Sequence, residues 1–281
     1  MKVKVKNLGV LHLIVLILTT LIVGNFMGTG DSHALSPAIQ AVIGIYCPES
    51  LARWKFENGA LTTDSRSTNT LTNVNTVTAD TTNFKEGAAS ADLEASSSQY
   101  FTVTDANLAS GFPLKNGDTG KTLTISAWVR LESAIGAGAY YMLWSKYGEN
   151  KASLWFGLNE NERILMSLGY NSGASEETIG PHGTTLTSDG TTWYHVTGSY
   201  RDSDKAYALR VRSGTDCSVI GTDVTGTTTN NINVEDGTMG IGATLWSSWV
   251  YLYDGLIDDM AIFNKLLSAD QATMVCKGLY R

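Results

Sequence analysis

A short segment near the C-terminus is rich in aromatic residues, namely Trp246, Trp249, Tyr251 and Tyr253. The faces of such rings stack on the apolar C–H patches of sugars, and aromatic side chains exposed on loops mark binding sites. We therefore expect Trp246, Trp249 and Tyr251 to bind carbohydrate. The alternative is that the two tyrosines pack across neighbouring strands and that the two tryptophans cover the edge of a sheet.

An acidic pair, Asp258 and Asp259, interrupts an otherwise apolar run near the C-terminus. Alternate residues of a strand share one face, which places Asp258 with Met260 and Ile262. If that face is the core, Asp258 points inward, where a carboxylate must accept hydrogen bonds or bind a cation such as calcium. A structural acid bonded to backbone amides and a calcium ligand are the two interpretations of Asp258.

The elements that position these residues are predicted to be strands. Residues 122–131 alternate strictly, with Leu123, Ile125, Ala127, Val129 and Leu131 on one face, which is typical of a half-buried antiparallel strand. Clusters of Gly, Asn, Asp and Ser separate several such segments. Many short strands without alternating helices predict an all-β sandwich with two antiparallel sheets, a jelly roll.

One helix is predicted at the C-terminal end of the chain. Ser268 followed by Gln271 forms a capping-box pattern, and Gly278 stands where a helix C-terminal cap belongs. The expected architecture is therefore a β-sandwich with a short C-terminal helix.

The N-terminus has the layout of a secretory signal peptide. Three lysines precede an apolar stretch, and the small residues around Ala34 suit cleavage, so residues 1–34 are predicted to be a signal peptide. An uncleaved membrane anchor is the alternative. Residues 35–50 are predicted to be a linker and 51–281 a single domain, either secreted or displayed at the cell surface.

Charge and cysteine content exclude several classes of protein. Without residues 1–34 the chain holds 17 Lys and Arg against 26 Asp and Glu, a formal charge of −9, and it has no basic cluster. A nucleic-acid partner is therefore not expected. Its three cysteines, Cys47, Cys217 and Cys276, include no Cys-x-x-Cys pair, which argues against a zinc site.

Five segments, in order, resemble the laminin-G-like (concanavalin A-like) jelly-roll family. These are Leu51 to Phe56 with Asp64-Ser65, Phe84 to Val103, Leu123 to Val129, Trp193 to Val196 with Tyr200, and Gly255 to Asn264 with Leu267-Ser268. The resemblance implies two packed antiparallel sheets with neighbouring termini. It also implies frequent calcium binding and frequent carbohydrate or matrix binding, usually without catalysis.

The resemblance adds a second calcium ligand and a disulfide. It pairs Asp258 with Asp64 in a shared calcium site, although Arg66 stands where the family usually has a glycine. The first and last strands of this class are neighbours, so Cys47 and Cys276 are predicted to form a disulfide, leaving Cys217 free.

Motifs of enzymes with this architecture are missing from the sequence. Laminarinase-type hydrolases carry Glu-x-Asp-x-Glu to place two carboxylates around one glycosidic bond, and the acidic pairs here have a different spacing. Gly-x-Ser-x-Gly and phosphate-binding glycine loops do not occur either. We expect an extracellular, non-catalytic module that binds a glycan. The alternatives are a structural or adhesion protein that contacts another protein, and a divergent glycosidase or polysaccharide lyase.

Overall fold

The computed structural model describes residues 48–148, 152–245 and 249–280, with the backbone alone for Trp249. The proposed signal peptide, Cys47 and Trp246 lie outside these residues. Within them, no helix has the length and apolar character needed to cross a membrane. The signal peptide and the linker stay predictions.

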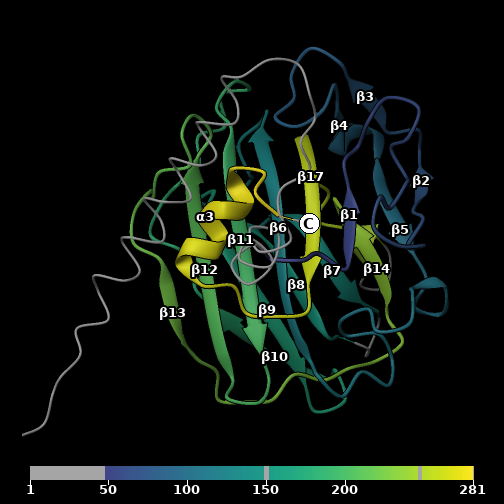
Figure 1. The fold of residues 1–281 in the computed structure, drawn as a ribbon, viewed down its shortest axis with the longest axis vertical. Coiled ribbons are helices and arrows are strands. Elements are labelled where there is room, and N and C mark those ends of the chain that lie inside the picture. The colour runs from purple at the N-terminus through teal and green to yellow at the C-terminus, as the bar shows by residue number, and fades with distance from the viewer. Residues whose placement is uncertain (1–47, 149–151, 246–248, 281) are drawn as a thin grey trace, which may run out of the picture. The chain divides into compact units, whose positions relative to one another are not determined.

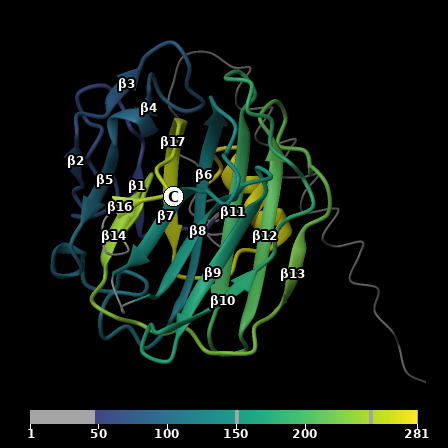
Figure 2. The same ribbon diagram turned by 180° about the vertical axis from the view of Figure 1, so that it is seen from behind.

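Two antiparallel sheets build the fold, as predicted (Figures 1 and 2). The first has eight strands in the order β13-β12-β11-β6-β17-β4-β3, and β1 also pairs with β17. Its members are β1 (Ala52–Trp54), β3 (Thr78–Asp80), β4 (Ser90–Leu93), β6 (Thr122–Leu131), β11 (Tyr194–Arg201), β12 (Ala206–Ser213), β13 (Val224–Thr227) and β17 (Gly255–Phe263).

The second sheet has seven strands in the order β10-β9-β8-β7-β14-β5-β2 and is seen best in Figure 2. Its members are β2 (Thr72–Val74), β5 (Tyr100–Val103), β7 (Tyr140–Tyr147), β8 (Leu154–Asn159), β9 (Ile164–Tyr170), β10 (Ser175–Ile179) and β14 (Thr238–Ile241). A short hairpin joins β15 (Thr244–Leu245) to β16 (Trp249–Val250). Two 3-10 turns, η1 (Ala95–Ser97) and η2 (Asp105–Asn107), flank β5.

The core lies between the two sheets and follows the alternation of the sequence. The apolar residues of β6 enter one continuous hydrophobic cluster with alternate residues of the other strands, which confirms the inward face predicted for 122–131. The outer face of β6 is buried as well, so the expectation of a half-buried strand is wrong for that face. Polar side chains can be buried there because they bond one another. Thr124 Oγ1 lies 2.7 Å from Ser199 Oγ, and Ser126 Oγ lies 2.9 Å from His195 Nε2.

His195 on this covered face is a structural histidine. Burial first, and then the charge of Arg212, lower its pKa to about 3, so the ring is neutral at physiological pH. Its ring packs edge-on against Trp128 at 4.9 Å between centroids. Packing and the bond to Ser126 therefore account for His195 without a catalytic role.

Helix α3 (Ala269–Cys276) lies over β11 and β12, on the outer side of the eight-stranded sheet (Figure 1). Its predicted capping box is present, with the Ser268 hydroxyl accepting from Gln271 N and the Gln271 side chain accepting from Ser268 N. Gly278 has φ of +68°, a conformation that glycine adopts without strain, and the Leu279 N–H returns to Met274 O at 2.9 Å. Both predicted helix signals are confirmed.

The disulfide joins Cys217 to Cys276, so the predicted pair of Cys47 and Cys276 is wrong. Neighbouring termini alone do not decide which cysteine meets Cys276. The α3 helix crosses the eight-stranded sheet and brings its last residue to the loop after β12, where Cys217 lies. The two cysteines pack against Trp128 and Trp193, and the bond fixes the end of α3 to the sheet.

We predict that removal of this disulfide destabilises the domain. Closing a loop of 59 residues contributes about 4 kcal/mol in the chain-entropy model. The double variant Cys217→Ser, Cys276→Ser should therefore unfold at clearly lower denaturant concentration, whereas Cys47→Ser should not. Non-reducing peptide mapping should give a linked peptide pair containing Cys217 and Cys276. Recovery of Cys276 linked to Cys47 would contradict the assignment.

Candidate functional site

The seven-stranded sheet has an outer face that is chemically distinct from its core face. The strand registers place alternate residues outward, opposite in phase to core residues such as Phe156 and Met166. On the five central and edge strands β10, β9, β8, β7 and β14 these outward residues are Glu176, Thr178, Leu165, Ser167, Gly169, Trp155, Gly157, Asn159, Tyr140, Met142, Ser145, Tyr147, Thr238 and Gly240. The face is therefore aromatic and polar, with a single carboxylate.

Three rings form a row across this face, which we call the aromatic row: Tyr251, Tyr140 and Trp155. The Tyr251 and Tyr140 rings meet edge to face at 5.2 Å between centroids, and Tyr140 meets Trp155 in the same way at 5.5 Å. Tyr251 follows the β15–β16 hairpin, and its carbonyl accepts from Met142 N at 3.0 Å, which ties it to β7. Its side chain is 37 % exposed, and those of Tyr140 and Trp155 are half-buried.

Glu176 of β10 continues the row at the edge of the sheet. Its carboxylate accepts from Trp155 Nε1 at 3.0 Å, from Ser167 Oγ at 2.8 Å and from Tyr147 Oη. Burial and the neighbouring Glu176 carboxylate raise the pKa of Tyr147 far above its usual value, so its hydroxyl remains a donor. Three donors on three strands therefore hold Glu176 in a fixed position beside the Trp155 ring.

The predicted aromatic residues have different places in the fold. Tyr251 is exposed, as binding requires, whereas Tyr253 is fully buried and donates its hydroxyl to Arg130 O at 3.1 Å. The packing alternative is therefore right for Tyr253. Trp249 pairs through its backbone with Leu245, and Trp246 lies outside the described residues. The roles of Trp246 and Trp249 stay predictions.

Sequence reasoning did not identify Tyr140, Trp155 and Glu176 as members of this site. The signal was present in the alternation. Trp155 stands out of phase with Leu154 and Phe156, which enter the core, so it must face outward. Glu176 could not be placed, because the register of β10 on β9 depends on tertiary pairing.

Asp64 is held by its own network of hydrogen bonds. Its Oδ1 accepts from Arg53 N and Arg66 N, both at 2.9 Å, and its Oδ2 accepts from Asn69 Nδ2 at 2.6 Å. These N–H groups occupy the lone pairs that a cation would need. Asp64 therefore organises its loop through hydrogen bonds.

A β-bulge overturns the orientation predicted for Asp258. The register of β17 on β6 shifts between Asp258 and Ala261, and Asp259 has φ of +46°. The extra residue puts Ile257 and Met260 into the core and turns both acids to the outer side. Strict alternation therefore gave the wrong face for Asp258.

Asp258 and Asp259 are both buried on that outer side, with different partners. Asp258 Oδ2 accepts from Lys85 N at 2.6 Å and Glu86 N at 2.9 Å, while its Oδ1 has no partner among the described residues. Burial raises its pKa to about 7 despite these two amides. Asp259 instead forms an ion pair with Arg53 at 2.6 Å and accepts from Tyr280 Oη at 2.7 Å. Asp258 is therefore bonded to backbone amides, as the structural alternative predicts, and its role as a calcium ligand stays a prediction.

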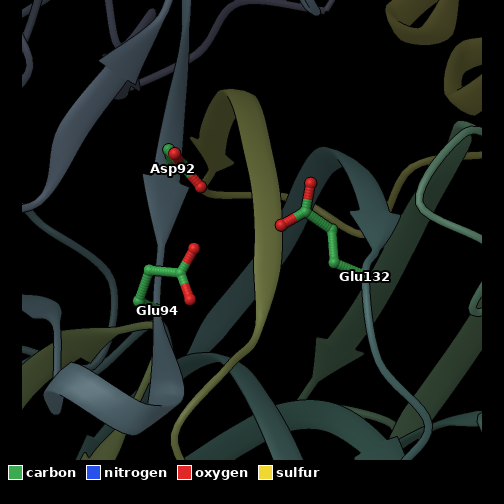
Figure 3. A group of neighbouring side chains, drawn as sticks. All are labelled: Asp92, Glu94 and Glu132. Atoms are coloured by element: carbon green, nitrogen blue, oxygen red, sulfur yellow. The ribbon is translucent and has the colours of Figure 1, made fainter.

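Three other acids do come together, on β4 and just after β4 and β6 (Figure 3). Oxygen atoms of Asp92, Glu94 and Glu132 lie within 4.8 Å of one another, which is a spacing that a cation could bridge. Burial and then the charges of Glu132 and Glu94 raise the pKa of Asp92 to about 6. Arg130 Nη2 donates to Glu132 at 2.6 Å, so the three acids already have one positive charge beside them. Of the described residues, these three are the set that could hold a metal ion.

Comparison with known proteins places the fold. The family model described as "Concanavalin A-like lectin/glucanases superfamily" matches residues 95–273. A search of curated protein sequences finds no match. Among solved structures, domain 4 of AbnA, a GH43 extracellular arabinanase from Geobacillus stearothermophilus, in complex with arabinotriose, has a TM-score of 0.57 and 16 % identity, over 84 % of this chain and 100 % of that one.

Botulinum neurotoxin binding domains are also similar. The binding domain of neurotoxin DC in complex with SialylT has a TM-score of 0.58 and 14 % identity, and the same domain in complex with rat synaptotagmin II has 0.56 and 14 %. Each match covers 82 % of this chain and 52 % of the toxin chain, so this chain spans about half the length of those domains. At such identities the likeness is one of fold.

Replacing Asp258 and replacing Asp259 should change the stability of the fold in opposite directions. A carboxyl whose pKa rises from about 4 in the unfolded chain to about 7 in the fold binds a proton on folding. Its contribution to stability is therefore present below that range and is lost as the pH rises through 7. Asp258→Asn should remove this loss, so the free energy of unfolding of the variant should rise relative to that of the unmutated protein between about pH 5 and pH 8.

Asp259→Asn provides the comparison. It removes the ion-pair partner of the Arg53 side chain, which is 14 % exposed, and should cost about 3 kcal/mol at every pH in this range. Urea unfolding at a series of pH values measures both variants. Parallel pH profiles for the unmutated protein and Asp258→Asn would show that Asp258 does not take up a proton on folding.

Proposed function

The chain belongs to the concanavalin A-like lectin/glucanase superfamily, and we propose that it is an extracellular, non-catalytic module that binds a glycan on its aromatic row. The observation that carries the proposal is the row itself, Tyr251, Tyr140 and Trp155 side by side on the outer face of a sheet. Export is proposed from the signal-peptide pattern of residues 1–34.

The chemistry of the row suits a sugar chain. Aromatic rings offer flat apolar surfaces to the C–H faces of sugar rings, and Glu176 beside Trp155 offers an acceptor to hydroxyl groups. A linear glycan laid along the row would meet both kinds of contact in sequence. Two of the similar folds are bound to sugars, arabinotriose in the arabinanase domain and SialylT in the toxin binding domain.

The non-catalytic part of the proposal rests on the distribution of carboxylates. Glycoside hydrolysis needs two carboxyl groups on either side of one bond. Glu176 is the one charged side chain among the outward positions of the described seven-stranded sheet, and its three partners are neutral donors. A site with one carboxylate and three neutral donors would bind a glycan and leave the glycosidic bond intact.

Protein contact is the second candidate function, and the toxin domain in complex with synaptotagmin is the observation in its favour. The large apolar side chains exposed in the described residues are Phe84, Val219, Tyr251 and Leu279. They come from four separate segments of the chain, and Tyr251 alone belongs to a ring cluster. Aromatic stacking therefore favours the glycan over the protein partner.

We predict that Tyr251→Ala weakens glycan binding about tenfold, since it removes the most exposed ring of the row. Its melting temperature should change little, because the side chain is 37 % exposed. Binding to a glycan array followed by isothermal titration measures the effect. Phe84→Ala is the matched control, as Phe84 is 38 % exposed and lies next to Lys85 and Glu86, which contact the eight-stranded sheet.

Two outcomes would contradict the aromatic row as the glycan site. Equal affinity of Tyr251→Ala and the unmutated protein for every bound glycan would refute the row as the site. A large fall in melting temperature together with unchanged binding would show that Tyr251 is a packing residue.

A further inference from the structure

The outer face of the seven-stranded sheet has an unbalanced charge. Its outward positions include one acid, Glu176, and no lysine or arginine in the described strands. Lys146 of β7 lies on the core side and ends against Asp105 at 2.6 Å. Arg163 precedes β9 and donates to Thr185 Oγ1 at 3.2 Å. Arg163 lies at the end of β9 away from Gly169, the residue that pairs with Glu176, so the described strands place no cation beside Glu176.

Glu176 is also unable to turn away from the row. Trp155, Ser167 and Tyr147 donate to its two oxygens from strands β8, β9 and β7, and each of these donors sits on a paired strand. A carboxylate has about four lone-pair positions, so about one stays available for a ligand hydroxyl. The negative charge is therefore fixed at the end of the row, next to the Trp155 ring.

This fixed charge discriminates between classes of sugar. A neutral sugar on Trp155 can donate a hydroxyl to Glu176. A uronate or sulfate in the same place would bring a second negative charge to about 5 Å, where repulsion in water lowers affinity about fourfold and partial exclusion of water increases the effect. No cation of the described strands lies beside Glu176 to compensate for it.

Resting on the proposed function, we propose that Glu176 is a specificity-determining residue that restricts the bound glycan to neutral polymers. It does so in two ways, by accepting a hydroxyl from a neutral sugar and by repelling the carboxylate or sulfate of an acidic one.

The test compares neutral and acidic oligosaccharides of equal length, arabino- and xylo-oligosaccharides against oligogalacturonates, on the full chain. The unmutated protein should bind the neutral class at least about fourfold more tightly at low ionic strength, and the ratio should shrink in high salt. Glu176→Gln should reduce the ratio by about the same factor through a gain in affinity for oligogalacturonate.

Glutamine keeps the local structure intact, because its oxygen accepts from Trp155 and Ser167 and its amide can donate to the Tyr147 hydroxyl. Asp270→Asn is the control for net charge, since Asp270 is an exposed acid in the first turn of α3, on the other sheet. It should leave the ratio unchanged.

The binding measurements distinguish failure of the restriction to neutral glycans from failure of the proposed glycan binding. Equal or tighter binding of oligogalacturonate by the unmutated protein overturns the restriction to neutral glycans. A ratio of neutral to acidic affinity that neither Glu176→Gln nor high salt changes overturns it as well. In both cases the proposed glycan binding itself is not refuted. Absence of binding to both classes overturns the proposed function and the restriction together.

Discussion

The strands of the seven-stranded sheet other than β2 send side chains into one hydrophobic core, and this packing determines which residues the opposite face can carry. Phe156 and Met166 enter the core, so their neighbours Trp155 and Ser167 must point outward. The core residues fix the register of β8 on β9, and the register places Trp155 within reach of Glu176. The position of Trp155 in the aromatic row is thus set by the packing of its neighbours in the core.

A short hairpin completes the row from outside the sheet. Tyr251 directly follows β16, and the hydrogen bond from Met142 N to its carbonyl holds it at β7. On the opposite side of the sandwich, the bulge in β17 has a comparable effect. One extra residue turns Asp258 and Asp259 outward, where they anchor the 85–86 loop and the C-terminal tail. The hairpin and the bulge, two departures from regular sheet structure, therefore position Tyr251 and the two buried acids.

The sequence was sufficient for the features that depend on local pattern. Alternation in 122–131 gave β6 with its bounds, and the Ser268–Gln271 box and Gly278 gave both ends of α3. The features that depend on long-range pairing could not be obtained in this way. The bulge at Asp259 reversed the face of Asp258, and the path of α3 joined Cys276 to Cys217. For the site, Tyr251 was identified by residue type, whereas Glu176 required the register of an edge strand.

The proposed function depends on the stacking of a glycan on the aromatic row. The most direct measurement is an NMR titration of the indole N–H signals of the tryptophans with a bound oligosaccharide, with the Trp155 signal assigned by its loss in Trp155→Phe. We expect the Trp155 signal to shift and to reach saturation, because its ring would contact the sugar and its Nε1 binds Glu176. Buried Trp54 and Trp144 in the core should not respond. Saturable shifts confined to other tryptophans, with the Trp155 signal unmoved, would show that the glycan does not stack on the aromatic row.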